Sequence, residues 1–441
     1  MTWIMAIALL LRLIFIGQSL WLDEAIEALA LMGKQGPLLT YALGDYQPPL
    51  YHFIGYLFTH LFGYSELVLR LPSLISGILT VYFLIKIGEY LASKQVGLVA
   101  GILAATNPLL IYYSVEGRTY AMTTFFVTAS FYYFLRLLKT KNLKFSVLYS
   151  LFTILFIWTS YLSWFVLLVQ GLYVLYKKRY DIFILQVGSA LTLLAWVPSF
   201  LSSLRIGQST MGGSPEWGKV VGGLNWKSLP LTWVKFVIGR IGFDNKILYA
   251  LIVSFIALLH LSALRLLNFK KHHLLLLWLI APVILGLFTA TILPVYSYFR
   301  VLFVLPAYLL LLSLAISESK SKLIFPLIIT VQLLAVAYYG FSPRYHHEDW
   351  RTLVKDLPAT AQLAIPSRAQ QAPLLYYGWQ SPIIEPNHES LVGSKIYYVR
   401  YAEDIFDSAR LGQANFRDSG YTITSQQVYP GIQVDIYENS H

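Results

Sequence analysis

Long apolar runs follow one another through most of this chain, with short polar stretches between them. Of its 441 residues, 57% are hydrophobic and only 12% are charged, and the mean hydropathy is +0.60. A soluble globular domain needs more charge than this to cover its surface. Apolar runs of about 17–25 residues can cross a bilayer as helices. The sequence therefore predicts a polytopic α-helical membrane protein.

We place eleven membrane spans, the first of them retained because no small-residue cleavage site follows it. They are residues 3–19, 71–92, 95–113, 119–138, 145–160, 162–176, 181–200, 248–265, 273–291, 299–316 and 323–340. Basic residues cluster in four loops between these spans, at 136–144, 177–179, 270–271 and 320–322. Eleven spans put all four loops on one face, which the positive-inside rule makes cytoplasmic. The N-terminus is then cytoplasmic and the C-terminal tail external.

Two long external loops are expected, at 18–69 and 201–247. Within the first, 22–33 is predicted as a helix, and 49–63 is shorter than a usual span and begins at a proline pair. We interpret 49–63 as an interfacial or re-entrant helix of a membrane domain, 1–340. A second interfacial helix is predicted around 229–242.

From Phe341 onward the pattern changes to that of a small soluble α/β domain, 341–441, whose length suffices for an independent fold. Helices are predicted at 349–357, 369–377 and 403–418, and strands at 361–366, 395–401, 421–429 and 432–438. The motif EDWR at 348–351 is interpreted as a helix start with a packed Trp.

Charge is unevenly spread. Residues 1–340 hold 25 Lys and Arg against 11 Asp and Glu, whereas 341–441 hold 8 against 11. The basic excess fits loops that face anionic lipid head groups, and no basic stripe interleaved with aromatics suggests a nucleic-acid partner. The chain has no cysteine, which excludes disulfides and thiolate chemistry.

Acidic residues gather near the start of the membrane-like region. Five of the eleven acids in 1–340 lie between positions 23 and 66, among them the pair Asp23-Glu24 and Asp45. Charge beside hydrocarbon is costly and is usually functional. A cluster of proton acceptors at a membrane surface therefore points to chemistry.

Four motifs occur in register: WLDEA at 21–25, DYQPPLY at 45–51, RLPS at 70–73 and YSVEGRTY at 113–120. In this order they resemble the GT-C membrane glycosyltransferases, the relatives of protein O-mannosyltransferases and of the aminoarabinose transferase of lipid A (ArnT-like). The resemblance is strongest over about the first 140 residues. It implies an inverting enzyme of the plasma (bacterial inner) membrane that moves a sugar from a polyprenyl-phosphate donor to a lipid, glycan or protein acceptor on the external face.

The resemblance also implies roles for the acids. Asp23 matches the catalytic aspartate of the family, Glu24 its following acid, and Asp45 the acid ahead of the Pro-Pro pair. A carboxylate beside the acceptor hydroxyl can take its proton. The alternatives are that Asp23 and Glu24 only favour the positive end of a helix, and that Asp45 makes an Asx turn.

A lipid phosphate needs cationic or forked hydrogen-bond donors. Arg118 beside Glu116, and Arg300 in the YSYFR stretch at 296–300, are the leading candidates. Three further residues complete the substrate-binding set: Gln47, Tyr120 and Arg12, the last inside the first predicted span. The alternative for the arginines is snorkelling or a structural ion pair, and Arg12 either faces the carrier cavity or pairs with a polar group.

This sequence departs from the family at two positions. Gln47 stands where many relatives have His and the aminoarabinose enzymes have Lys. Tyr46 occupies the place of a glutamate metal ligand, so no metal residues are assigned and a divalent metal stays an open cofactor. His52 is interpreted as a packed interfacial residue.

Two rival functions remain open. A transporter or flippase of lipid-linked sugars would also need buried Arg and acids, although it should show repeated halves, which the sequence lacks. A non-catalytic membrane assembly protein could keep the fold while its tail binds partners. Loss of activity on changing Asp23, with folded protein retained, separates an enzyme from such an assembly protein.

Overall fold

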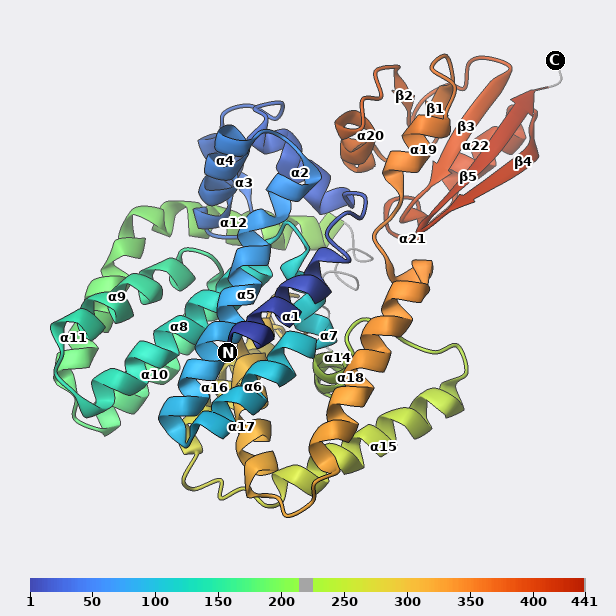
Figure 1. The fold of residues 1–441 in the computed structure, drawn as a ribbon. Helices are drawn as coiled ribbons and strands as arrows, with labels where there is room; N and C mark the ends of the chain where they lie inside the picture. Colours follow the sequence, from blue (N-terminus) through green and yellow to red (C-terminus); the bar gives the residue numbers. More distant parts are fainter. Residues whose placement is uncertain (214–224, 440–441) are drawn as a thin grey trace. The chain divides into compact units, whose positions relative to one another are not determined.

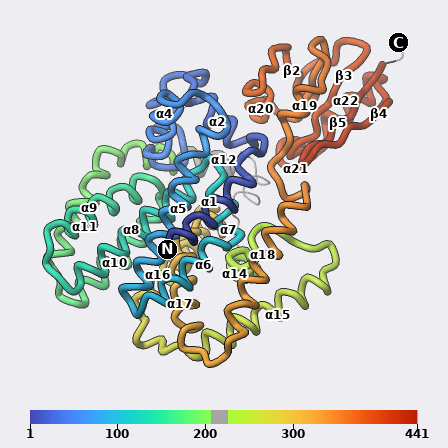
Figure 2. Tube along the Cα trace, viewed as in Figure 1, coloured from blue at the N-terminus to red at the C-terminus, as the bar shows by residue number. Residues whose placement is uncertain are grey.

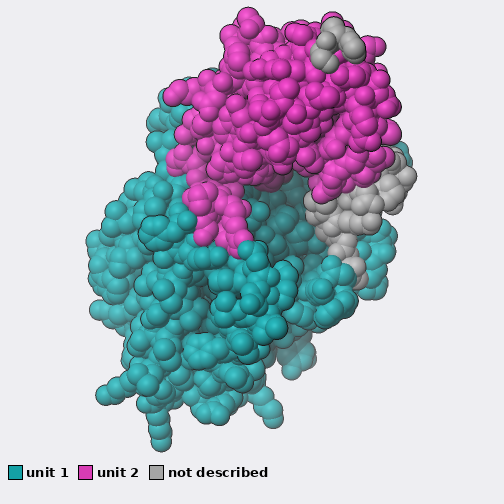
Figure 3. Space-filling view, turned by 90° about the vertical axis from the view of Figure 1, so that its right-hand side faces the viewer, with its two compact units in different colours: residues 1–16, 39–213, 218–341 teal, residues 17–38, 214–217, 342–441 magenta. Residues whose placement is uncertain are grey.

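The computed structural model describes residues 1–213 and 225–439, with the backbone alone over 206–213. The described chain divides into two compact units, coloured separately in Figure 3. The helical unit comprises 1–16, 39–213 and 225–341, and the C-terminal unit comprises 17–38 and 342–439. Residues 18–38, assigned from the sequence to an external loop of the membrane domain, thus cluster with the C-terminal residues.

The described part of the helical unit is built from helices (Figure 1). In chain order they are α1 (Thr2–Leu13), α3 (Leu38–Gly44), α4 (Leu50–Phe62), α5 (Glu66–Leu91), α6 (Lys94–Thr106), α7 (Pro108–Ser114), α8 (Thr119–Lys139), α9 (Leu143–Ile157), η1 (Tyr161–Ser163), α10 (Trp164–Tyr176), α11 (Tyr180–Leu191), η2 (Thr192–Trp196), α12 (Val197–Gly213), α14 (Ser228–Ile238), α15 (Lys246–Leu264), α16 (His273–Thr289), η3 (Leu302–Val304), α17 (Leu305–Glu318) and α18 (Ile324–Phe341).

Side-chain caps and a proline set where several helices begin. The Ser65 hydroxyl accepts from the Val68 N–H at 3.3 Å at the start of α5, which satisfies a backbone donor left over at a helix N-terminus. Asn107 caps α7 by accepting from the Leu109 N–H at 3.1 Å. Because the residue before a proline disfavours the helical conformation, the chain bends by 62° between α6 and α7, where Pro108 begins the second helix.

Helices α5 and α6 lie side by side along the trace in Figure 2. Glycines on α6 allow the close approach: a Cβ added to Gly97 would lie 2.6 Å from the Ile85 carbonyl oxygen, and one added to Gly101 would lie 2.4 Å from Ile85 Cγ1. Small residues four positions apart let helices come together in this way, and membrane helices use them widely.

Every predicted span overlaps an apolar helix. Five continuous helices are long and apolar enough to cross a bilayer, and the bent pair α6–α7 adds a sixth. The five are α5, α8, residues Tyr180–Arg205, α15 and α18. The other predicted spans correspond to shorter apolar helices of 10–17 residues, so the count of eleven and the orientation stay predictions.

Helix α15 shows how these helices meet their surroundings. Leu251, Phe255 and Leu258 repeat at helical spacing on one face and expose 64%, 55% and 68% of their surface. A continuous apolar face of this kind is unsuited to water and suited to lipid or to another apolar surface.

The predicted surface helices are present. Residues 22–33 form α2 (Leu22–Leu31), 49–63 form α4, and 229–242 form α14, which ends before Gly239 at a positive φ of 72°. Helix α12 continues to Gly213, into the predicted loop 201–247, whose external placement stays a prediction. Residues 214–224 of that loop lie outside the described residues.

The C-terminal unit contains a five-stranded sheet in the order β2-β1-β3-β5-β4. Its elements are α2, η4 (Pro343–Tyr345), α19 (Trp350–Asp356), β1 (Gln362–Ala364), η5 (Arg368–Gln370), α20 (Ala372–Tyr376), β2 (Ile383–Ile384), β3 (Lys395–Arg400), α21 (Glu403–Phe406), α22 (Leu411–Asp418), β4 (Tyr421–Tyr429) and β5 (Ile432–Asn439). β1 runs parallel to β2 and β3, whereas β3, β5 and β4 pair antiparallel. Successive side chains of β3 enter separate clusters: Val399 joins Trp350, and Tyr398 joins Phe416.

Two helix predictions in this unit are wrong in detail. The helix predicted at 403–418 is broken into α21 and α22, and the one at 369–377 into η5 and α20. The first break arises because Asp407 accepts from the N–H groups of Leu411 and Gly412, both at 2.8 Å, and so caps a new helix. Arg410, which lies between α21 and α22, takes a left-handed φ of 56°. The two-residue strand β2 was not predicted.

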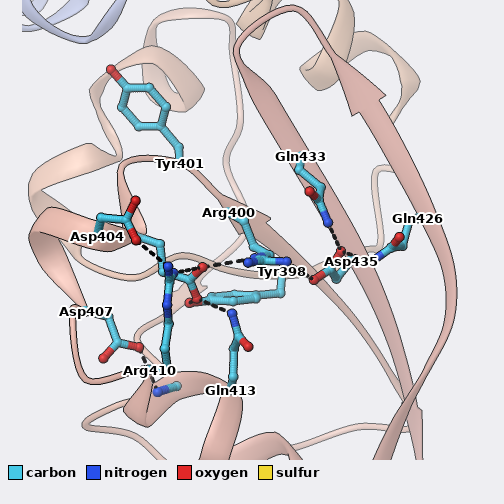
Figure 4. A network of polar contacts seen from close by, with 12 residues as sticks. Tyr398, Arg400, Tyr401, Asp404, Asp407, Arg410, Gln413, Gln426, Gln433 and Asp435 are labelled. Atoms are coloured by element: carbon cyan, nitrogen blue, oxygen red, sulfur yellow. Dashed lines mark hydrogen bonds and ion pairs between the residues drawn. The ribbon is translucent and has the colours of Figure 1, made fainter. Parts of the chain in front are cut away.

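A buried carboxylate organises the loop after β3, where Figure 4 shows the surrounding polar contacts. Glu403 accepts from the Tyr398 hydroxyl at 3.0 Å, from Arg400 Nε at 2.9 Å and from Gln413 Nε2 at 2.7 Å. Arg410 also pairs with it. Since burial without partners would be costly for a carboxylate, these contacts fix the loop against the sheet.

Candidate active site

The loop that carries Asp45 is held by distant parts of the helical unit. The Asp45 carbonyl oxygen accepts from the Ser203 hydroxyl of α12 at 2.9 Å. Just beyond the proline pair, the Leu50 N–H donates to the Trp158 carbonyl oxygen at 3.1 Å. The backbone around Asp45 is therefore fixed by α12 and by the end of α9.

Asp45 pairs with a histidine that the sequence analysis assigned only to packing. His52, buried on the first turn of α4, lies with its Nε2 2.9 Å from Asp45 Oδ2, and its ring meets Tyr41 edge-on at 5.2 Å. Burial by itself raises the pKa of Asp45, but the hydrogen bond and charge of His52, with the charge of Arg118, outweigh it and hold that pKa below its ordinary value. Asp45 therefore stays ionised.

The predicted Glu116–Arg118 turn joins α7 to α8. The Arg118 N–H donates to the Glu116 carbonyl oxygen at 2.8 Å, and the Arg118 carbonyl oxygen accepts from the Ser73 hydroxyl at 3.2 Å. Glu116 is buried and Arg118 half-buried. Because the charge of Arg118 acts on the carboxyl of Asp45, the second and fourth sequence motifs form one electrostatic site.

A pocket in the helical unit brings three predicted binding residues together. It has about 270 Å³ of empty volume and is lined by Gln47, Thr119, Tyr120, Thr123, Ser160, Leu162, Phe299, Arg300, Leu302 and Phe303. Tyr120 and Phe299 form an aromatic wall with ring centroids 5.1 Å apart. Arg300 Nη1 donates to the Pro294 carbonyl oxygen at 3.4 Å, which anchors part of its guanidinium.

These groups have the chemistry to receive a polar headgroup. A guanidinium, an amide and hydroxyls can donate hydrogen bonds to a phosphate, and aromatic rings can pack on the apolar face of a sugar.

Asp23 and Glu24 lie in the C-terminal unit, in the first turn of α2. Glu24 is fully buried, and its Oε2 lies 3.4 Å from His347 Nδ1. Asp23 is half-buried. The remaining predicted site residues belong to the helical unit.

Arg12 has structural partners in the helical unit. Its Nε donates to the Ser114 hydroxyl at 3.0 Å and its Nη1 to the Ala8 carbonyl oxygen at 2.9 Å. Of the two interpretations drawn from the sequence, these contacts favour pairing with polar groups.

Sequence reasoning missed His52, His347 and the pocket residues Thr119, Ser160 and Phe299. A histidine seven residues after an acid was the available signal for His52. Thr119 and Phe299 lie within the stretches 113–120 and 296–300 already singled out, whereas nothing local marks His347 or Ser160. Among the residues the structure describes, no three His, Asp or Glu side chains come together as a metal site would require.

The chain resembles proteins of one superfamily. Residues 46–201 match the family model of dolichyl-phosphate-mannose-protein mannosyltransferase. The structure is similar to that of ArnT from Cupriavidus metallidurans in the apo state, with a TM-score of 0.59 and 11% identity over 99% of this chain and 97% of that chain. The chain has the GT-C glycosyltransferase fold.

Two further structures resemble this chain. ArnT from Cupriavidus metallidurans bound to undecaprenyl phosphate has a TM-score of 0.59 at 12% identity, again over 99% and 97% of the two chains. The Archaeoglobus fulgidus oligosaccharyltransferase tethered with an acceptor peptide has a TM-score of 0.53 at 13% identity, over 100% of this chain and 74% of that one. No curated protein sequence matches the chain. The fold and the apolar helices make the GT-C protein an integral membrane protein.

Proposed function

We propose that this GT-C protein is an inverting glycosyltransferase, which moves a sugar from a polyprenyl-phosphate donor to an acceptor at the external face of the membrane. The observation that carries the proposal is the pocket where Gln47, Tyr120 and Arg300 converge in a fold shared with ArnT. The transferred sugar is a hexose or a pentose.

The relatives support the substrate classes. One similar structure holds undecaprenyl phosphate, and another is tethered with an acceptor peptide. By analogy, the donor lipid is a polyprenyl phosphate, and the acceptor is a hydroxyl of a lipid, glycan or protein.

The proposed step is one displacement at the anomeric carbon. The bond from that carbon to the carrier phosphate breaks while the acceptor oxygen bonds to the opposite face, through an oxocarbenium-like state. The carrier leaves as polyprenyl phosphate, whose charge Arg300 and Arg118 stabilise. The acceptor proton passes to a carboxylate, for which we assign Asp23.

We assign a role in this transfer step to each of three acidic residues. Asp23 is the base, and Glu24 beside it fixes the turn that carries Asp23. Asp45, held ionised by His52 and Arg118, places a negative charge that can stabilise the oxocarbenium-like state and is the alternative base. A divalent metal, if one takes part, is assigned no step.

The proposed arrangement in the membrane follows from charge. Eleven spans put the basic loops at 136–144, 177–179, 270–271 and 320–322 in the cytoplasm. The N-terminus is then cytoplasmic and the C-terminal unit external, in a plasma (bacterial inner) membrane. The polyprenyl-phosphate sugar is met on the external face.

Conservative substitution of the acids tests the assignment. Asp23→Asn keeps the size of the side chain but cannot accept a proton, so turnover should fall by about a hundred- to ten-thousand-fold while donor binding is retained. Glu24→Gln should reduce turnover less. Near-normal turnover in Asp23→Asn, with loss in Asp45→Asn, would move the base to Asp45. Near-normal turnover in both variants would refute the catalytic role of these acids.

A further inference from the structure

The segment that precedes α2 is hydrogen-bonded to the C-terminal residues of its own unit. The Tyr377 hydroxyl accepts from the Leu20 N–H at 2.8 Å and from the Ser19 hydroxyl at 3.2 Å. The Ser19 oxygen in turn accepts from the Arg351 N–H at 3.2 Å, and Arg351 Nη2 donates to the Gly17 carbonyl oxygen at 3.1 Å. Gly17, Ser19 and Leu20 are thus hydrogen-bonded to two segments that lie more than 300 positions later in the sequence.

His347 continues this attachment up to the first turn of α2. Its N–H donates to Gln18 Oε1 at 3.1 Å, and its ring centroid lies 6.2 Å from that of Trp21. Its Nδ1 lies 3.4 Å from Glu24 Oε2. Since the Glu24 side chain is fully buried and a buried carboxylate needs a partner, this contact fixes the direction in which α2 begins.

Arg351 and Tyr377, which hold the segment before α2, are close in sequence to residues of the hydrophobic core of the C-terminal unit. Trp350, beside Arg351, and Leu374, one turn before Tyr377, are both fully buried in one hydrophobic cluster. Asp349 caps α19 by accepting from the Thr352 N–H at 3.1 Å. Arg351 thus belongs to a capped helix, and Tyr377 directly follows α20, which contributes Leu374 to the core.

Asp23 lies between two residues that cannot move freely. Leu22 is 8% exposed and Glu24 is fully buried, and helical geometry fixes the direction of a side chain once its neighbours are fixed. Asp23 itself is half-buried. The contacts made at Leu20 and Glu24 therefore constrain the backbone from which the Asp23 side chain projects.

We infer that His347 and Tyr377 are positioning residues for the carboxylate of Asp23, so that the C-terminal domain is part of the catalytic apparatus rather than an accessory module. The inference rests on the proposed function, in which Asp23 is the base. His347 acts through Glu24, and Tyr377 acts through the backbone of Leu20.

Kinetics of the full-length protein in nanodiscs test the inference. Tyr377→Phe and His347→Ala should lower kcat by about ten- to a hundred-fold, because small misplacement of a catalytic group has effects of that size, while KM for the donor stays near normal. Tyr429→Phe is the matched control: its hydroxyl contacts Asp356 and Gln427, away from α2. It should leave kcat unchanged.

A double-mutant cycle separates positioning from general support of the fold. In an Asp23→Asn background, adding Tyr377→Phe or His347→Ala should cause little further loss, since the group that they position is gone. If the fold-reductions in kcat of the single variants multiply in full in the double variants, the inference is overturned. A kcat for Tyr377→Phe equal to that of Tyr429→Phe would overturn it as well. If the His347→Ala protein does not fold and cannot be recovered, the kcat of Tyr377→Phe alone decides whether the inference holds. Normal turnover in Asp23→Asn itself would instead refute the proposed function.

Discussion

His52 Nε2 and Asp45 Oδ2 lie 2.9 Å apart, on the first turn of α4 and in the loop before it. The contact links a buried imidazole to a carboxylate that also feels the charge of Arg118. An aspartate in this setting is kept ionised, and its negative charge is available to a cationic transition state.

Acid should weaken the Asp45–His52 contact. Because the pKa of Asp45 in the folded protein lies below its ordinary value of about 3.9, its contribution to stability is present above that pH and is lost as the pH falls through the folded pKa. Thermal unfolding in detergent, with Asp45→Asn as reference, measures this. The wild-type advantage in Tm should shrink as the pH falls below about 4, where Asp45 takes up a proton. An advantage that grows on acidification would contradict the account.

Arg300 should hold the donor phosphate. Charge-assisted hydrogen bonds contribute about 1.5–3 kcal/mol, so Arg300→Gln should weaken polyprenyl-phosphate binding by about ten- to a hundred-fold. Arg300→Lys should restore binding only in part, since Lys lacks the planar fork. Lys227→Gln, an exposed change outside the pocket, is the control. Equal donor Kd values for Arg300→Gln and the control would remove Arg300 from the site.

Cysteine labelling can determine the topology, because the chain has no cysteine. Cysteines introduced as Lys141→Cys and Gln380→Cys both occupy exposed positions. In intact cells, a membrane-impermeant maleimide should label position 380 and leave position 141 unlabelled until the cells are lysed. Labelling of 141 but not 380 would invert the proposed orientation.

Glu403 should be needed for stability of the C-terminal unit. Glu403→Gln leaves Arg400 and Arg410 without their shared carboxylate. Because these arginines are 28% and 39% exposed, the loss should be about 2–3 kcal/mol, less than for a fully buried pair. Glu438→Gln, which breaks the exposed pair with Lys395, should cost less than about 1 kcal/mol. Pulse proteolysis of the full chain measures both, and equal losses would contradict the network.

Local sequence signals predicted most elements well. Apolar length located a helix in every predicted span, and alternation located β3, β4 and β5. The missed break between α21 and α22 depends on Asp407 capping backbone donors four and five residues ahead. Hydrophobic periodicity does not reveal such a side-chain cap, because the polar residues around it are also compatible with a continuous helix.

The site was predictable only in part, for a similar reason. Gln47, Tyr120 and Arg300 were chosen as binding residues, and all three line one pocket. The assignment of Glu24 to the C-terminal unit could not be read from its neighbours in sequence. One contact that ties Glu24 to this unit is with His347, more than 300 residues away in sequence, and no single-sequence pattern encodes such a pairing.

The most direct test of the account compares the lipids and envelope glycans of cells that carry the wild-type protein, the Asp23→Asn variant or no copy, by mass spectrometry. If the protein is a glycosyltransferase, one sugar should disappear from an acceptor in the Asp23→Asn strain and in the strain without the protein. The polyprenyl-phosphate donor of that sugar should accumulate on the external leaflet. A flippase predicts that the donor is retained on the cytoplasmic leaflet. Unchanged glycans and donor pools in both strains would contradict the central claim.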